Sequence, residues 1–182
     1  MIALILLVVV VLIVFWAISI YNRLVKHKNL VKEGWSGIDV QLKRRTDLIP
    51  NLLETVKGYA KHEEDLFKKV TELRARSMDA QGVAEQGQAE SALSQSLMNL
   101  FAVAENYPEL KADQNFRQLQ TELSSLEDHI QMARRYYNGT ARDFNILIES
   151  FPSNLVANSF GFQMAEYFEI DSQEREVPEV KF

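Results

Sequence analysis

An apolar stripe along residues 35–73 dominates the pattern of hydrophobic and polar positions. Its steps alternate between three and four residues, which places the stripe on one side of an α-helix that faces a partner helix, as in a coiled coil. Arg45 and Glu63 are charged residues within the alternation, and Pro50 also lies inside it. We predict a long central helix that continues past Gly58. The apolar members are Trp35, Ile38, Leu42, Ile49, Leu52, Val56, Tyr59, Leu66, Val70 and Leu73.

Pro50 leaves two interpretations of this helix. Proline has no amide hydrogen and crowds the carbonyl four residues earlier, which is that of Thr46. The helix either ends near Thr46 and restarts with Asp47 as its N-cap, or it continues with a kink at Pro50. The stripe keeps its phase across Pro50, and this continuity favours the kink.

Residues 2–18 form an uncharged and almost wholly apolar segment. A helix that rises about 1.5 Å per residue needs about 20 residues to cross the hydrocarbon layer. We therefore predict a transmembrane anchor over residues 1–22. A cleaved signal peptide is disfavoured, because no basic residue precedes the apolar run and residues 18–21 make a poor cleavage site.

The residues that flank this segment predict its orientation. Trp16 and Tyr21 lie where an interfacial aromatic belt is expected, and Arg23, Lys26 and Lys28 follow them. The positive-inside rule then places the rest of the chain in the cytoplasm and the N-terminus outside. These cations also fit a merely solvated face. Because no linker rich in Gly, Pro or Ser follows, we expect the anchor to continue into the next domain as one rod.

The remaining pattern predicts an elongated antiparallel bundle over residues 23–168. A turn is expected near residues 79–82, and a helix with apolar residues in step follows it and ends before Pro108. A second long helix begins near Pro108 or Asp113 and should pair with the first in antiparallel fashion. Its stripe is Phe116, Leu119, Leu123, Leu126, Ile130, Ala133, Tyr137, Ala141, Phe144 and Ile148.

Glycine and proline mark positions inside and at the end of the second long helix. Gly139 lies inside this helix and is expected to allow a close backbone approach. The word Phe151-Pro152-Ser153-Asn154 should end the helix and begin a short amphipathic segment, residues 155–162. Residues 169–182 are predicted to form an acidic, disordered tail.

Composition agrees with an all-α, membrane-bound class. The chain has 182 residues, 47% hydrophobic content, and only 7 Gly and 4 Pro. It has no Cys, which excludes disulfides and thiolate metal sites. Its formal net charge of −5 makes nucleic acid an unexpected partner. The expected partners are the lipid bilayer, further copies of the chain, and another membrane protein.

Motifs for catalysis or cofactor binding are weak. His62-Glu63-Glu64-Asp65 lacks the second histidine of a zinc motif, so we interpret it as a surface charge patch. No glycine-rich phosphate loop or nucleophile elbow occurs. No cofactor, metal, catalytic residue or small-molecule substrate is therefore predicted.

Arg45 and Glu63 remain as the candidate site residues. A charge in an apolar seam must be paired, and such pairs commonly fix helix register. The acidic partners offered for Arg45 are Glu122, Glu127 and Asp128, and those for Glu63 are Arg134 or Arg135. The alternative is a binding or catalytic site. Tyr136, Tyr137 and Asn138 are interpreted as core residues with a hydrogen-bonded hydroxyl, and a ligand pocket is the lesser alternative.

Four short sequence motifs (the words given below), spread over about residues 20–168, together resemble the LemA family of bacterial proteins. The resemblance implies one N-terminal membrane helix with its N-terminus outside and a cytoplasmic bundle of long helices. It implies no established activity, cofactor or functional residue. The words are Tyr21-Asn22-Arg23-Leu24-Val25, Arg44-Arg45-Thr46-Asp47-Leu48-Ile49-Pro50-Asn51-Leu52 with Val56-Lys57-Gly58-Tyr59-Ala60, Ala133-Arg134-Arg135-Tyr136-Tyr137-Asn138, and Phe151-Pro152-Ser153-Asn154.

Three functional hypotheses follow. The leading one is a non-enzymatic, single-pass protein that self-assembles or scaffolds partners at the cytoplasmic face of the bacterial inner membrane. The second is an accessory subunit that regulates a membrane enzyme such as a quality-control protease. The third is an enzyme that uses Arg45, Glu63 and the region of residues 136–138.

Overall fold

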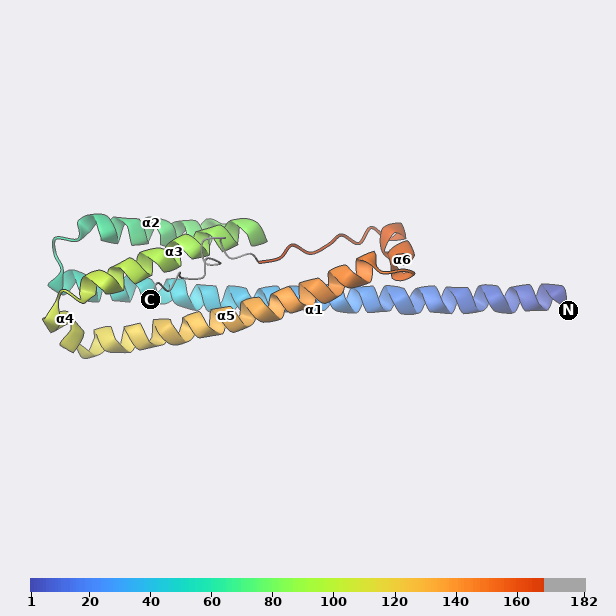
Figure 1. The fold of residues 1–182 in the computed structure, drawn as a ribbon, viewed down its shortest axis with the longest axis horizontal. Coiled ribbons are helices and arrows are strands. Elements are labelled where there is room, and N and C mark those ends of the chain that lie inside the picture. The colour runs from blue at the N-terminus through green and yellow to red at the C-terminus, as the bar shows by residue number, and fades with distance from the viewer. Residues whose placement is uncertain (169–182) are drawn as a thin grey trace, which may run out of the picture. The chain divides into compact units, whose positions relative to one another are not determined.

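The computed structural model describes residues 1–168, all of whose regular elements are helices (Figure 1). The all-α prediction is therefore confirmed for the described part of the chain. The predicted acidic tail, residues 169–182, lies outside it. The elements are α1 (Ile2–Tyr59), α2 (Glu64–Asp79), α3 (Val83–Ala104), α4 (Pro108–Ala112), α5 (Gln114–Glu149) and α6 (Ser153–Ser159).

Helix α1 is continuous over 58 residues and contains both the apolar N-terminal segment and Pro50. The helix therefore does not end at Thr46, and the alternative in which Asp47 begins a new helix is wrong. The expected continuation of the apolar segment into the next domain without a linker is confirmed, because no residue between Ile2 and Tyr59 leaves the helix.

The prediction that the central helix continues past Gly58 is wrong. Helix α1 ends at Tyr59, a turn occupies residues 60–63, and α2 begins at Glu64. Apolar residues on both sides of the turn, such as Val56 and Val70, belong to one hydrophobic core. The stripe therefore keeps its phase while the chain reverses, and residue spacing alone does not reveal such a reversal.

The chain divides into two compact units, which share helices α1 and α5. The first unit consists of Met1–Gly37 and Arg134–Tyr167. The second contains residues 38–133, and it also includes Phe168. The second unit has the larger core, to which α1, α2, α3, α4 and α5 all contribute, for example through Leu52, Phe67, Leu100, Leu110 and Phe116.

Within the second unit, α1 and α5 pair in antiparallel fashion, as predicted. Arg45 pairs with Glu127, and the Tyr59 hydroxyl donates to the Asp113 carboxylate at 3.0 Å. Asp113 also caps α5, because its carboxylate accepts the Phe116 amide at 2.9 Å. These two hydrogen bonds, the amide first, hold the pKa of the Asp113 carboxyl below its usual value, whereas the same carboxylate raises the pKa of Tyr59.

The predicted boundaries around α3 agree with the structure. The turn between α2 and α3 occupies residues 80–82, and α3 ends at Ala104, before Pro108. Both expected starting points of the next helix are used: Pro108 begins the short helix α4, and Asp113 precedes α5.

The close approach of α1 and α5 in the first unit occurs at Gly34, not at Gly139. A Cβ atom on Gly34 would lie 3.1 Å from the Tyr137 Cα, which is tighter than nine in ten such contacts. A Cβ atom on Gly139 would meet nothing within 4 Å. The expectation for Gly139 is therefore wrong, because this glycine does not lie at the helix contact.

Helix α6 ends at Ser159, and after a turn at Gly161 the following residues return along α5. Gly161 has a φ of 67°, a left-handed conformation that favours glycine. The side-chain amide of Asn145 then makes two hydrogen bonds with the Ala165 backbone, at 2.9 and 2.8 Å. These hydrogen bonds attach the segment that follows α6 to α5 within the first unit.

Candidate functional site: a buried arginine network

Arg45 is a charged side chain inside the core of the second unit. It lies on α1 and is 1% exposed, and Glu90 on α3 is 0% exposed. A buried charge is costly unless it is paired and hydrogen-bonded. The fold must therefore supply acceptors for the guanidinium and donors for the carboxylate.

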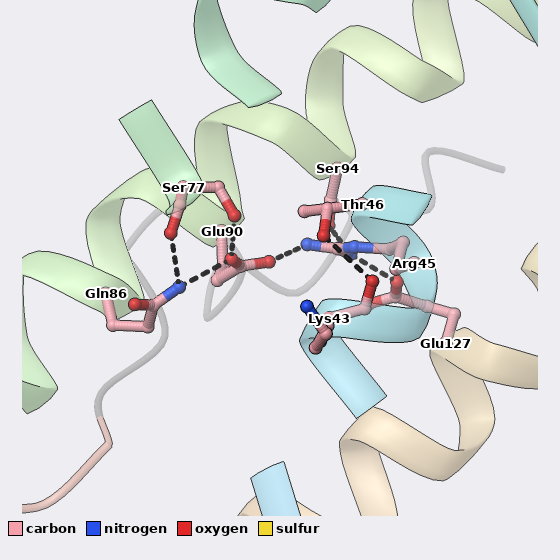
Figure 2. A network of polar contacts seen from close by, with 8 residues as sticks. All are labelled: Lys43, Arg45, Thr46, Ser77, Gln86, Glu90, Ser94 and Glu127. Carbon is pink, nitrogen blue, oxygen red and sulfur yellow. Dashed lines mark hydrogen bonds and ion pairs between the residues drawn. The ribbon is translucent and has the colours of Figure 1, made fainter. Parts of the chain in front are cut away.

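The guanidinium of Arg45 donates to three side chains (Figure 2). One terminal nitrogen donates to the carboxylate of Glu90. The other donates to the Ser94 hydroxyl at 2.8 Å and to the Glu127 carboxylate at 2.7 Å. Since Glu90 and Ser94 lie on α3 and Glu127 lies on α5, this one side chain joins three helices.

Glu90 extends the network to α2. The Ser77 hydroxyl donates to the Glu90 Oε1 atom at 2.5 Å, and the Gln86 amide donates to the same atom at 2.7 Å (Figure 2). The Gln86 amide also donates to the Ser77 carbonyl at 3.1 Å. The carboxylate thus receives donors from α1, α2 and α3.

The backbone next to Arg45 makes a further link to α2. Pro50 has no amide hydrogen, so the carbonyl of Thr46 loses its usual helical donor. The Nε atom of Arg74 on α2 donates to this carbonyl at 2.6 Å. Thr46 is buried, and Arg74 therefore satisfies an acceptor that proline leaves open in the core.

The network links four helices, α1, α2, α3 and α5. A buried ion pair adds little net stability compared with apolar packing, but the removal of one partner costs about 3–5 kcal/mol. A helix shifted by one turn would separate Arg45 from its partners on α3 and α5. The geometry thus suits the fixing of register, with the guanidinium and carboxylate groups bonded to groups of the protein itself.

Part of this network was predicted from the sequence. Glu127 is among the three acidic partners offered for Arg45, but Glu90 and Arg74 were missed. Glu90 lies three residues before Leu93, in phase with the apolar stripe of α3, and this charge within the stripe could have revealed it. Arg74 had no comparable signal, because the acceptor that it satisfies is a backbone atom.

Glu63 lies elsewhere in the second unit, in the turn between α1 and α2. Its carboxylate accepts a hydrogen bond from the Tyr107 hydroxyl at 3.1 Å. Burial raises the pKa of Tyr107, and the Glu63 carboxylate adds to this effect. The predicted pairing of Glu63 with Arg134 or Arg135 is therefore wrong, and Glu63 is not part of the Arg45 network.

Tyr137 is a core residue of the first unit, as expected. Its ring packs against that of Trp35 at a centroid distance of 5.6 Å, and its hydroxyl donates to the Glu166 carbonyl at 2.8 Å. Burial raises the pKa of this hydroxyl. Tyr136, in contrast, is exposed, so the core interpretation fails for that residue.

The residues predicted to mark the membrane boundary lie on α1 within the first unit. Trp16, Arg23, Lys26 and Lys28 are exposed. Tyr21 contacts the rings of two phenylalanines that follow α6, Phe160 and Phe162, at centroid distances of 4.8 and 5.8 Å. The Lys28 ammonium lies 5.7 Å from the ring centroid of Phe162. The expected boundary therefore lies beside α6.

A family comparison decides the class of this chain. The model of the LemA family matches residues 34–182. The chain belongs to the LemA family. The resemblance seen in the four sequence words is confirmed.

Relatives of this LemA-family chain include magnetosome proteins. Protein LemA of Metamycoplasma hominis is 28% identical over 158 residues, with 85% of this chain and 71% of the relative covered. Magnetosome protein MamQ 2 of Paramagnetospirillum magneticum is 26% identical over 175 residues, with 82% of this chain covered. Magnetosome protein MamQ of Magnetospirillum gryphiswaldense is 24% identical over 174 residues, with 81% of this chain covered. The chain spans only 64% of the length of each of these MamQ proteins.

Family and relatives together identify a membrane-associated helical protein.

In this LemA-family chain, a surface groove of about 800 Å³ lies between α3 and α5 beside the network. Arg45 and Glu127 form part of its lining, together with Met98 and Phe101. Within residues 1–168, no group of three or more His, Asp or Glu side chains is placed to hold a metal ion. Arg45, Ser94 and Glu127 of the network line this groove, and Glu127 is partly exposed.

Proposed function

We propose that this chain is a non-enzymatic, membrane-anchored helical protein that assembles with its own copies or holds partner proteins at the cytoplasmic face of the bacterial inner membrane. The observation that carries the proposal is the continuity of α1. One helix contains both the apolar segment and the residues that form the core of the helical bundle.

The apolar segment supports membrane anchoring. Helix α1 is the one helix within residues 1–168 that is long and apolar enough to cross a membrane. Every side chain from Ile2 to Trp16 is exposed. Such a surface is unfavourable in water, and a lipid bilayer covers it without any other protein.

The exposed cations that follow the segment support the proposed orientation. Arg23, Lys26 and Lys28 are exposed and lie within the first turns after the apolar run. Positive residues at this distance favour the cytoplasmic side of the membrane. The bundle then lies in the cytoplasm.

The use made of the charged residues supports a structural role. Arg45, one of the two charged residues within the predicted apolar stripe, donates hydrogen bonds to side chains of α3 and α5. The network specifies how helices pack, and a defined surface is what an assembling or scaffolding protein needs. The related proteins are named for a family or for the magnetosome, and neither name carries an activity.

Co-purification tests assembly. Two differently tagged copies are expressed in one cell and extracted together with their lipids in polymer-bounded nanodiscs. Recovery of the second tag through the first supports self-assembly, and stoichiometric recovery of one other membrane protein supports scaffolding or the accessory-subunit alternative. Recovery of neither contradicts the proposal.

The absence of native cysteine allows a direct test of orientation. A Lys68→Cys variant places one thiol on the exposed surface of α2. We expect a membrane-impermeant maleimide to label it only after the inner membrane is opened. Labelling in intact spheroplasts would contradict a cytoplasmic bundle.

A further inference from the structure

Three large apolar side chains on and next to α6 are exposed. Phe151 precedes the helix, Leu155 lies on it and Phe160 follows it, and these side chains are 79%, 56% and 63% exposed. We call these three residues the α6 patch. Several large apolar side chains exposed within one short segment mark a surface that is covered in the functional protein.

The opposite face of α6 packs on the end of the apolar segment. Val156 and Ala157 belong to one hydrophobic cluster with Leu24, and Ala17 and Ile20 pack against this cluster. The ring of Phe160 also contacts that of Tyr21. These residues of α1 span the last turns of the apolar run and the first charge after it, at Arg23. In the first unit, α6 thus lies at the level where α1 leaves the apolar run.

The composition around α6 suits the interfacial layer of a membrane. No Asp, Glu, Lys, Arg or His occurs between Ser150 and Ala165, in a chain that is 25% charged. Two hydroxyl groups of α6 are hydrogen-bonded to nearby backbone carbonyls. Ser153 donates to the Leu147 carbonyl at 2.6 Å, and Ser159 donates to the Leu155 carbonyl at 2.7 Å. Hydroxyls that are already bonded lower the cost of leaving water.

From this placement we infer that the α6 patch inserts into the interfacial layer of the same bilayer that α1 crosses. This inference rests on the proposed membrane anchoring. If residues 2–18 span the hydrocarbon layer, residues 17–24 lie at its edge, and α6 packs on these residues. Phenylalanine and leucine side chains bind such interfaces favourably, and the exposed Lys26 and Lys28 are suited to anionic headgroups. Helix α6 then gives the first unit a second membrane contact, which a single spanning helix does not provide.

Single-cysteine spin labels test the inference on the full-length chain. The labels are placed in Leu155→Cys and Phe160→Cys variants, with Val9→Cys in the apolar segment and Lys68→Cys on α2 as controls. Each protein is reconstituted in vesicles of phosphatidylethanolamine and phosphatidylglycerol. The measurement is the ratio of label accessibility to oxygen, which enters lipid, over accessibility to a nickel chelate, which stays in water. Circular dichroism confirms that each labelled protein keeps its helix content.

We expect the ratio to be highest at position 9, lowest at position 68, and clearly above the water value at positions 155 and 160. A water-like ratio at both α6 positions, with a lipid-like ratio at position 9, would overturn this inference and leave the anchor intact. A water-like ratio at position 9 would instead refute the anchoring itself. Protection of the α6 labels from both reagents would also overturn the inference, because it would show that protein, such as a second copy, covers the patch.

Discussion

The hydrogen bond from Arg74 to the Thr46 carbonyl yields a sharp prediction about Pro50. The carbonyl is open to Arg74 because residue 50 has no amide hydrogen. An Arg74→Met variant keeps much of the side-chain volume but leaves a buried acceptor without its donor. A Pro50→Ala variant restores an amide at the position from which a helix supplies that donor itself.

The magnitude follows from the burial of Thr46, which is 4% exposed. A buried carbonyl that loses its hydrogen bond costs about 1–3 kcal/mol. Arg74→Met should therefore lower the free energy of unfolding by about 1–3 kcal/mol when residue 50 is proline. When residue 50 is alanine, the helix amide takes over, and the same change should cost less than about 1 kcal/mol. The coupling between the two positions is thus expected to be about 1–2 kcal/mol.

Pulse proteolysis in urea measures these free energies on the detergent-solubilised full-length chain. The fraction of protein that survives a brief protease pulse is recorded against urea concentration for wild type, both single variants and the double variant. Arg76→Met is the matched control, since Arg76 is an exposed arginine on the same helix. Its effect should lie within about 0.5 kcal/mol of zero in both backgrounds.

Additivity would refute this explanation of the Arg74 contact. If Arg74→Met costs the same with proline and with alanine at position 50, the arginine does not replace the donor that proline lacks. If Arg74→Met is no more destabilising than Arg76→Met, the carbonyl does not depend on the arginine at all.

Three further predictions use the same proteolysis assay. Arg45→Met should lower the free energy of unfolding by about 3–5 kcal/mol, because it leaves the Glu90 carboxylate buried without its cation. Adding Glu90→Gln should recover part of that loss. A double variant less stable than the single variant would refute this explanation. Gly34→Ala should be less stable than Gly139→Ala by about 1–3 kcal/mol, because both variants gain helix propensity but only the first places a methyl group against the facing backbone. Equal stabilities would show that the contact between residue 34 and the Tyr137 backbone relaxes freely. The pKa of Asp113 is lowered, so its contribution to folding stability is complete above about pH 4 and is lost as the pH falls through that lowered value. Asp113→Asn should therefore weaken the fall in unfolding free energy at acid pH. An unchanged fall would contradict the cap.

The sequence predicted the helices well because each buried face repeats at helical spacing. The stripe of α5 from Phe116 to Ile148 is buried or half-buried at every predicted position. The boundaries at residues 80–82 and at Pro108 follow from glycine and proline, which act locally. The turn after Tyr59 was missed because α1 and α2 face the same core, so the stripe passes through the reversal without a change of phase.

The candidate site was only partly predictable, since its partners come from distant parts of the chain. A charge inside an apolar stripe marked Arg45, and the facing helix offered Glu127. The same rule applied to α3 points to Glu90. The bond from Arg74 to the Thr46 carbonyl could not be found in this way, because pairing rules for side chains do not describe a backbone acceptor.

The placement of glycine illustrates the same limit. Gly34 and Gly139 both lie inside long helices, and the sequence does not distinguish them. Only the packing of α1 on α5 shows that the first faces the Tyr137 backbone and the second faces open space.

The most direct test of assembly at the membrane is the mass of the protein as it exists in its membrane. Full-length protein is extracted with native lipids in polymer-bounded nanodiscs, its protein mass is measured by light scattering, and its particles are imaged by electron microscopy. We expect a mass well above the 20.9 kDa of one chain, either as a regular assembly of copies or as a defined complex with another membrane protein. A protein mass of one chain at every concentration, with no second protein present, would contradict it.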